Sequence, residues 1–242
     1  MAINLYEMEK YIQSKEFFDY SETVETRQKA ALTFIEKNNE QTDPSVSDYL
    51  VAFSTRSQSY CVGLVDIVNS SKISASLSPA KLSQYYEIFL NSMSKIIGKF
   101  GGKVIKNIGD CLLYYFPNSI NGAEEGLTNC LDSGLAMSNA QKIISDEMIL
   151  KKLPRLNYRI SADFGTVILM NTSCSSAIDL IGPSVNMCSK INHCAGRNEF
   201  VIGNDLREVA KNLPAYEYGE IQGFDLGFKF PYPVYRVESS YR

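Results

Sequence analysis

Two aspartates stand where short apolar strands are expected to end. Asp66 lies near the carboxyl end of the almost continuously apolar run 60–68, and Asp110 lies at the tip of the hairpin KVIKNIGDCLLYYF, residues 103–116. Two carboxylates that meet on one rim of a sheet repel each other unless a divalent cation lies between them. Such a pair can hold two metal ions roughly 3.5–4 Å apart and clamp a phosphoryl group during an in-line displacement. The alternative is that each acid caps a turn or pairs with a lysine.

A second polar pair shares one face of an expected helix. Asn186 and Lys190 are four residues apart in GPSVNMCSKINHC, which begins near Pro183. The plainer interpretation is a surface helix with one lysine. His193, at the expected end of this helix, is the only histidine of the chain. We therefore expect neither a nucleophilic triad nor a zinc cluster built on histidine.

The composition narrows the class of protein. The chain has 242 residues, a formal net charge of -3 and 45% hydrophobic residues, which suits one globular domain with a sizeable core. It lacks the basic excess that contacts with nucleic-acid phosphates require. Its six cysteines show no metal-ligand spacing, and no apolar run is long enough to span a bilayer. We expect a cytoplasmic protein without a nucleic-acid or membrane partner.

The elements that must position the acids are predicted by hydrophobic spacing and turn residues. Ser78 and Pro79 are typical of a helix start, and Gly101-Gly102 of its end. The order predicts an α+β fold in which helices pack over one face of a mostly antiparallel sheet. The expected elements are a strand over 60–68, a helix over 79–100, the hairpin 103–116, a helix over 120–148, two strands over 157–170 joined at Gly165, a helix over 183–194, and closing strands.

The first 58 residues differ in character from the rest of the chain. They are charged and helix-prone, with apolar residues on one stripe, and a second helix of this part is expected to begin near Ser21. We therefore expect an N-terminal helical extension over 1–58 that packs on the main domain or on a partner. The main domain then covers 59–242.

Four segments together resemble a known family. LVDIV, GGKVIKNIGDCLLYYFP, YRISADFG and IDLIGPSVNMCSKI occur in the order and spacing of class III nucleotidyl cyclase catalytic domains, over roughly residues 60–238. The resemblance implies a ferredoxin-like, palm-like sheet. The chain departs from the family after Ile67, where NSSKIS replaces the usual glycine, aromatic residue and threonine.

The resemblance assigns roles to the acids and to two further residues. It implies that Asp66, Asp110 and the Ile67 carbonyl bind two Mg²⁺ or Mn²⁺ ions per site. It also implies that Lys106 and Asp179 select the purine, in the combination typical of adenine. Adenine offers N1 as an acceptor and its amine as a donor, which an ammonium and a carboxylate complement.

The remaining family positions are partly altered. Asn186 resembles the residue that orients the ribose. Lys190 stands where the family has an arginine that stabilises charge on the α-phosphate, and lysine lacks the planar fork that grips two oxygens. The family also has a late lysine that binds the terminal phosphates. The position in this chain nearest to that lysine is Pro233, and Lys229 lies a few residues earlier.

These features lead to one main prediction and to alternatives. The main prediction is an adenylate cyclase that converts ATP to 3′,5′-cyclic AMP and pyrophosphate in a head-to-tail homodimer. The acids would come from one subunit, and Lys106, Asp179, Asn186 and Lys190 from the other. The alternatives are a cyclase-homology domain that binds nucleotide and dimerises without turnover, a guanylate cyclase, and a polymerase-like palm, against which the missing basic face speaks.

Overall fold

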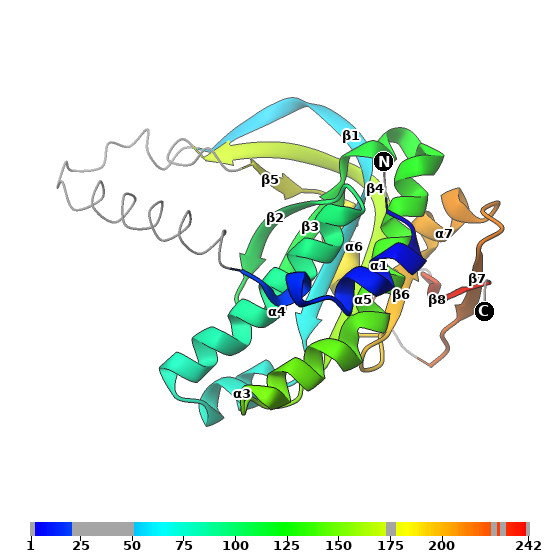
Figure 1. The fold of residues 1–242 in the computed structure, drawn as a ribbon. Helices are drawn as coiled ribbons and strands as arrows, with labels where there is room; N and C mark the ends of the chain where they lie inside the picture. Colours follow the sequence, from blue (N-terminus) through cyan, green and yellow to red (C-terminus); the bar gives the residue numbers. More distant parts are fainter. Residues whose placement is uncertain (1–2, 21–50, 173–177, 224–226, 228–230, 241–242) are drawn as a thin grey trace, which may run out of the picture.

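A mostly antiparallel sheet organises the computed structural model, which describes residues 3–20, 51–172, 178–223, 227 and 231–240 (Figure 1). The strand order is β2-β3-β1-β4-β6-β8-β7, with β5 paired to β4, and of these pairs only β4–β6 is parallel. The strands are β1 (Val51–Ile67), β2 (Lys103–Ile108), β3 (Cys111–Phe116), β4 (Tyr158–Thr172), β5 (Ile178–Ile181), β6 (Phe200–Gly203), β7 (Tyr216–Glu220) and β8 (Val234–Ser239).

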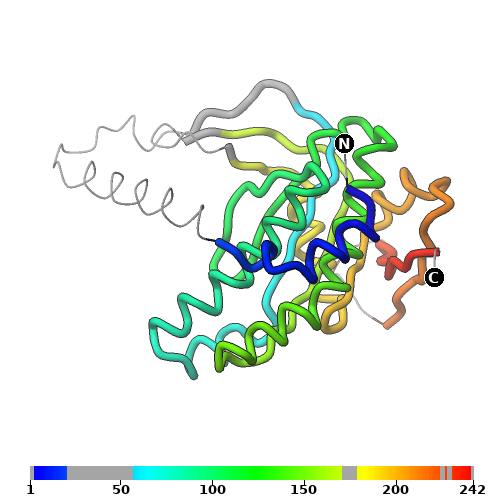
Figure 2. Tube along the Cα trace, in the orientation of Figure 1, coloured from blue at the N-terminus to red at the C-terminus, as the bar shows by residue number. Residues whose placement is uncertain are grey.

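Helices flank the sheet on both of its faces. Helices α4 and α5 run side by side over one face, α1 lies over α5, and the 3-10 turn that follows α1 lies on α4 (Figures 1 and 2). The helices are α1 (Leu5–Ile12), α3 (Ser70–Ser76), α4 (Pro79–Lys99), α5 (Glu124–Leu150), α6 (Pro183–Asn192) and α7 (Asn204–Ala210), with 3-10 turns η1 (Lys15–Phe18) and η3 (Pro117–Gly122). The predicted α+β class, with helices packed on an antiparallel-rich sheet, is confirmed.

The expectation that helices cover only one face is wrong. Alternate residues of a strand point to opposite faces of its sheet. In β4, Ile160 joins the core under α4 and α5, whereas the Ser161 hydroxyl donates to the Cys188 carbonyl of α6 at 2.9 Å. Helix α6 therefore packs on the face opposite to α4 and α5. Its polar contacts with the strand are not visible in a pattern of apolar residues alone.

The two central strands are longer than the sequence predicts. The run 60–68 forms only the end of β1, which begins at Val51 and pairs with β4 along its length. The predicted break at Gly165 is wrong as well. Gly165 continues β4 and pairs opposite Tyr60, because the partner strand supplies hydrogen bonds on both sides of the glycine.

The main core lies between the sheet and the pair α4–α5. Helix α4 begins with Pro79 at its first turn, and Gly101, with φ of 77°, ends it. The buried stripe of α4 includes Phe89, which has no exposed surface. Truncating such a side chain to alanine typically costs about 3–5 kcal/mol of stability. This layer fixes the strand ends that carry the candidate site.

Part of the N-terminal segment belongs to the same core. Met8, Ile12 and Phe17 are at most 1% exposed and pack with α4 and α5. The Lys95 ammonium donates to the carbonyls of Glu16, Phe17 and Asp19 at 2.7–3.0 Å, which holds η1 on α4. The second expected helix, from Ser21 on, lies outside the described residues. The domain boundary after residue 58 stays a prediction.

The helices differ widely in length, from seven residues in α3 to 27 in α5. Among the described segments of the chain, no helix is both long enough and apolar enough to cross a lipid bilayer.

Candidate active site

A two-residue turn presents Asp110 at the tip of the β2–β3 hairpin. Ile108 and Cys111 pair across the turn, so Gly109 and Asp110 are its two central residues. Gly109 has φ of 61°, a conformation that glycine adopts without the steric cost of a Cβ atom. The glycine therefore makes a tight turn possible, and Asp110 extends beyond the paired strands.

The two candidate metal-binding acids meet at this rim. Asp66 pairs opposite Cys111, and the Ile67 N–H donates to the Asp110 carbonyl at 3.3 Å, which ties the turn to the end of β1. Burial and the nearby charge of Asp110 raise the pKa of Asp66 to about 6. A carboxyl group between strand ends that carries so raised a pKa is poised to accept a cation. The expected meeting of the two acids is thus present in the fold.

Three residues near the acids were not assigned to the site from the sequence. Arg159 of β4 pairs opposite Asp66, and its charge, together with that of His193, lowers the pKa of Asp66 against the effect of burial. Burial and the two aspartates raise the pKa of the Cys111 thiol to about 12. The sequence could have indicated Cys111, because it follows Asp110 directly. The position of Arg159 beside Asp66 depends on the register between β1 and β4, which cannot be read from the sequence.

The donor set suits a cation that shares its ligands with a substrate. Among the described residues there is no group of three or more His, Cys, Asp or Glu side chains that could hold a metal. Magnesium is commonly held by one or two carboxylates plus substrate phosphates and water. Asp66 and Asp110 fit that pattern. The Ile67 side chain is 2% exposed and belongs to the core, so only its backbone carbonyl can serve, and that role stays a prediction.

The two candidate base-selecting residues contact each other. Lys106 of β2 forms an ion pair with the Oδ2 atom of Asp179 on β5, with side chains 40% and 24% exposed. The Asp179 Oδ1 atom accepts the Leu180 N–H at 2.8 Å, which fixes the orientation of the carboxylate. Residues that are 73 positions apart thus form one polar site between two strands. Both retain exposed surface through which a ligand can reach them.

Helix α6 presents the third group of candidate residues. Pro183 occupies its first turn, and Asn186 and Lys190 lie one turn apart on its exposed side. They border a surface cavity of about 700 Å³, a size typical of small-molecule sites. The cavity is lined by Ile181, Gly182, Pro183, Asn186, Met187, Ser189 and Lys190.

A buried polar network fixes α6 on the sheet. The Asn192 amide donates to the Ser161 hydroxyl at 3.1 Å and to the Arg159 carbonyl at 3.4 Å, and Ser161 in turn bonds to Cys188. Asn192 and Ser161 are at most 2% exposed. Buried hydrogen bonds of this kind specify one arrangement of the elements that they join. The network therefore sets the direction in which α6 presents Asn186 and Lys190.

The segment before β8 is held by a buried carboxylate. The Tyr232 hydroxyl donates to Asp163 Oδ2 at 2.8 Å, and the N–H groups of Phe164 and Leu206 donate to Asp163 Oδ1 at 2.9 and 3.2 Å. Pro233, next in the chain, has neither a charge nor an N–H donor for a phosphate. Lys229 lies outside the described residues. A terminal-phosphate ligand is thus not assigned.

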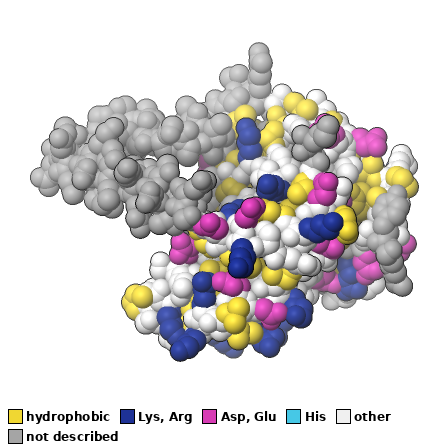
Figure 3. All heavy atoms as spheres, viewed as in Figure 1, with side chains coloured by type: hydrophobic (Ala, Val, Ile, Leu, Met, Phe, Trp, Pro, Cys, Tyr) yellow, Lys and Arg dark blue, Asp and Glu magenta, His cyan; other side chains and the backbone are white. Residues whose placement is uncertain are grey.

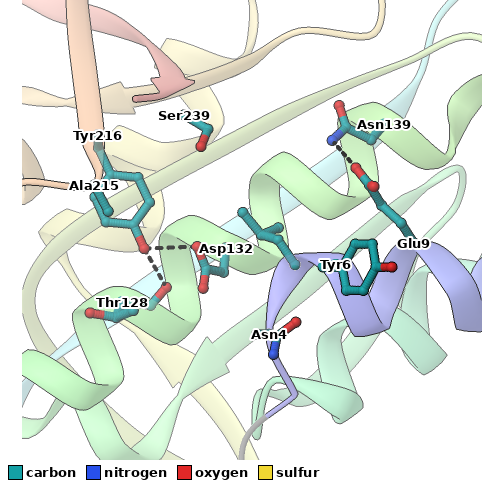
Figure 4. A pocket seen from close by; sticks show the side chains of 10 residues that line it. Asn4, Tyr6, Glu9, Thr128, Asp132, Asn139, Ala215, Tyr216 and Ser239 are labelled. Atoms are coloured by element: carbon teal, nitrogen blue, oxygen red, sulfur yellow. Dashed lines mark hydrogen bonds between the residues drawn. The ribbon is translucent and has the colours of Figure 1, made fainter. Parts of the chain in front are cut away.

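A separate cavity of about 690 Å³ lies between α1, α5 and the start of β7 (Figure 4). The Tyr216 hydroxyl donates to Asp132 Oδ1 at 2.8 Å, and the Asn139 amide donates to Glu9 Oε1 at 3.2 Å. None of the residues with predicted roles lines it. These bonds hold α1 and β7 against α5, and volume alone does not make the cavity a site.

Known proteins share this fold and much of this sequence pattern. Residues 53–224 match the family model described as "Adenylate and Guanylate cyclase catalytic domain". The crystal structure of the adenylyl cyclase CyaB from P. aeruginosa aligns with a TM-score of 0.70 and 24% identity, over 78% of this chain and 98% of that one. At this identity the likeness supports the fold.

Two curated relatives are adenylate cyclases. That of Anabaena cylindrica is 29% identical over 133 residues, 52% of this chain and 25% of the relative. That of Glutamicibacter nicotianae is 26% identical over 168 residues, 67% of this chain and 36% of the relative. The chain thus corresponds to less than half the length of either. Because the family model spans well over half of the chain, the protein belongs to the adenylate and guanylate cyclase catalytic-domain family.

Proposed function

We propose that this protein is an adenylate cyclase that converts ATP to 3′,5′-cyclic AMP and pyrophosphate, with two Mg²⁺ or Mn²⁺ ions per site in a head-to-tail homodimer. The observation that carries the proposal is the meeting of Asp66 and Asp110 at one rim of the sheet, where burial and the charge of Asp110 raise the pKa of Asp66. Membership in a family of nucleotidyl cyclases supplies the class of reaction.

In the proposed reaction the ribose 3′-hydroxyl loses its proton to solvent water and the oxygen attacks the α-phosphorus. A bond forms between O3′ and the α-phosphorus. The bond from that phosphorus to the oxygen bridging to the β-phosphate breaks, and pyrophosphate leaves with the electron pair. Bound divalent cations would lower the pKa of the 3′-hydroxyl and neutralise charge on the phosphate oxygens. Asp66 and Asp110, with the Ile67 carbonyl, would hold them.

Lys106 and Asp179 would read the base. In the proposed orientation the Lys106 ammonium donates to adenine N1, and Asp179 accepts from the exocyclic amine. Their mutual ion pair supports this assignment, because it keeps a donor and an acceptor side by side at a partly exposed position. Guanine offers an acceptor at O6 beside a donor at N1, so the same pair complements it in a shifted orientation. Turnover of ATP beside GTP therefore tests the base assignment directly.

Asn186 and Lys190 would act on the sugar and the α-phosphate. Asn186 would orient the ribose so that O3′ lies in line with the bond that breaks. Lys190 would place a positive charge beside the α-phosphate oxygens as negative charge develops there. Both residues are exposed on α6, which suits contact with a nucleotide whose metal ions are held by the acids of the other subunit.

The dimer would join two incomplete sites. Strand β2 is an outer strand of the described sheet, and its Val104 and Ile108 are 38% and 54% exposed. Ile181, at the end of β5, is 43% exposed. Apolar side chains beside the candidate residues favour a contact that buries them. In a twofold arrangement, one chain would give its acids to one site and its α6 to the other.

Two features of the sequence favour a second candidate function. Lysine at position 190 gives a point charge in place of the family's bidentate arginine, and Pro233 supplies no ligand for the terminal phosphates. A domain with these two changes would suit nucleotide binding and dimerisation without turnover. In that case the acids and the Lys106–Asp179 pair would serve recognition only.

Turnover assays distinguish the candidates. The purified chain is incubated with ATP or GTP and Mn²⁺ at several protein concentrations, beside the Asp66→Asn and Lys190→Arg variants. Cyclic AMP that rises more steeply than protein concentration and is abolished in Asp66→Asn supports the proposal. Cyclic GMP in excess overturns the base assignment. Saturable nucleotide binding with no cyclic product, even from Lys190→Arg, selects the second candidate.

A further inference from the structure

A basic and apolar corner forms where α5 ends beside the start of α4. We define this corner by six residues, which are Lys81, Ile149, Leu150, Lys151, Lys152 and Arg155. Leu150 is 78% exposed and Ile149 41%, and both belong to the last turn of α5. Lys and Arg side chains gather with hydrophobic ones along the lower edge of the face in Figure 3, over the lower ends of these helices in Figure 1.

The exposure of Leu150 is imposed by an ordered helix end. Lys152 has φ of 57°, the Leu153 N–H donates to the Met148 carbonyl at 2.9 Å, and the Lys152 N–H donates to the Ile149 carbonyl at 2.9 Å. These two bonds form a Schellman motif, in which the residues flanking the end make an apolar contact. Leu153 and Met148 are accordingly buried, at 5% and 0% exposed. Leu150 is the residue that this geometry leaves facing outward.

The charges of the corner are largely uncompensated. The Lys81 ammonium donates to the Lys152 carbonyl at 3.1 Å, which places the two lysines together. Lys151 pairs with Glu147 at 3.1 Å. Lys81, Lys152 and Arg155 have no carboxylate partner within the part of the chain that the structure describes. A local positive charge thus stands on a chain whose net charge is -3.

The shape of the corner favours a lipid surface over a protein partner. Stable protein interfaces bury about 800 Å² on each partner, whereas the apolar part here is two exposed side chains at the end of one helix. Peripheral membrane contacts need less, because apolar side chains enter the headgroup region while nearby cations attract anionic lipids. Leu150 beside these lysines and the arginine has this combination.

We propose that the corner docks the protein on an anionic lipid surface, with Leu150 entering the bilayer interface and Lys81, Lys152 and Arg155 facing the headgroups. The sequence did not lead us to expect a membrane partner, because it contains no apolar run long enough to span a bilayer. A contact with the bilayer surface requires no such run. The proposal is independent of catalysis, so its test needs no nucleotide.

Vesicle flotation with the full chain tests the proposal. Vesicles of phosphatidylcholine alone are compared with vesicles that contain about 30% phosphatidylglycerol, at low and at physiological salt. We expect binding to the anionic vesicles only, weakening as salt rises. Arg155→Glu and Leu150→Ser should each reduce the bound fraction on the order of tenfold. Circular dichroism and a thermal melt of each variant show whether it is folded like the wild type.

Matched variants on other surfaces serve as controls. Arg197 is an exposed arginine between α6 and β6, and Val209 is 39% exposed on α7. Arg197→Glu and Val209→Ser should leave binding unchanged. The proposal is overturned if the wild type does not float with anionic vesicles or floats equally with neutral ones. It is also overturned if folded corner variants bind like the wild type, or if the controls lose binding equally.

Discussion

Asp163 should make the stability of the fold depend on pH. This carboxylate is 1% exposed and accepts hydrogen bonds from Tyr232, Phe164 and Leu206, so it joins β4 to the first turn of α7 and to the segment before β8. Asp163→Asn keeps an amide oxygen for the two backbone N–H donors and can donate to the Tyr232 oxygen. The substitution removes the charge with little change in packing.

The size of the effect can be worked out from the change in pKa. Burial raises the pKa of Asp163 from 3.8 to about 7, while its hydrogen bonds oppose the rise. Since the folded pKa lies above the unfolded one, the contribution to stability is complete below about pH 4 and is lost as pH rises toward about 7. Roughly three pH units correspond to on the order of 4 kcal/mol, of which about 2–3 kcal/mol falls between about pH 5 and pH 8.

Urea unfolding, followed by circular dichroism across this pH range, measures the effect. The free energy of unfolding of the wild type should fall relative to that of Asp163→Asn by about 2–3 kcal/mol as pH rises from about 5 to 8. Asp205→Asn, at an exposed position beside the same hydrogen bonds, removes a charge that itself helps to raise the pKa of Asp163, so it should weaken the pH dependence without abolishing it. A difference between wild type and Asp163→Asn that is constant with pH, or that grows in favour of the wild type, refutes the reasoning.

Three further predictions concern the candidate site. Asp66→Asn should raise the melting temperature in metal-free buffer by about 2–8 °C, because removing a half-buried charge that Asp110 repels is worth about 1–2 kcal/mol after solvent screening. Cyclase activity should be lost in the same variant. An unchanged or lower melting temperature contradicts this prediction. Asp66→Asn and Lys106→Glu should each be inactive alone, but an equal mixture of the two variants should recover about a quarter of wild-type activity. The reason is that half of the dimers in the mixture contain one chain of each variant, and each such dimer has one intact site. No recovery after subunit exchange argues against sites shared between subunits. Asn192→Ala should lower kcat on the order of tenfold with little change in KM for ATP, because the Asn192 amide orients α6 and not the strands that carry Lys106 and Asp179. If kcat falls and KM rises by similar factors, together with a lower melting temperature, the role of Asn192 is structural only.

The hairpin and the helix start were predictable because their signals are local. Gly109 before Asp110 specifies a tight turn within four residues, and Ser78 with Pro79 specifies a helix start within two. The meeting of Asp66 with Asp110 needed one further inference, that the strand and the hairpin are neighbours. The pairing of β1 with β3 confirms it.

The features that the sequence did not reveal depend on pairing over long distances. The charges of Arg159 and His193 affect the pKa of Asp66 only because β4 pairs with β1 and because α6 packs on the same sheet. The side of the sheet that α6 occupies is set by hydrogen bonds of Ser161 and Asn192, which are small polar residues in strongly apolar surroundings. An apolar pattern cannot indicate such contacts, because it records which residues are buried and not which partners they meet.

The state of the candidate residues in one chain argues that assembly and substrate organise the site together. Lys106 and Asp179 satisfy each other at a partly exposed position, where an ion pair is worth at most about 1 kcal/mol, so a base can compete for them at little cost. Asp66 and Asp110 are in the opposite condition, because their proximity is unfavourable until a cation joins them. The Lys106–Asp179 pair can thus bind a base in the single chain, whereas the Asp66–Asp110 pair requires metal. In the proposed dimer a full site takes one pair from each subunit, so folding of one chain does not form it. We therefore expect the rate of turnover to follow the concentration of dimer and not the total concentration of chain.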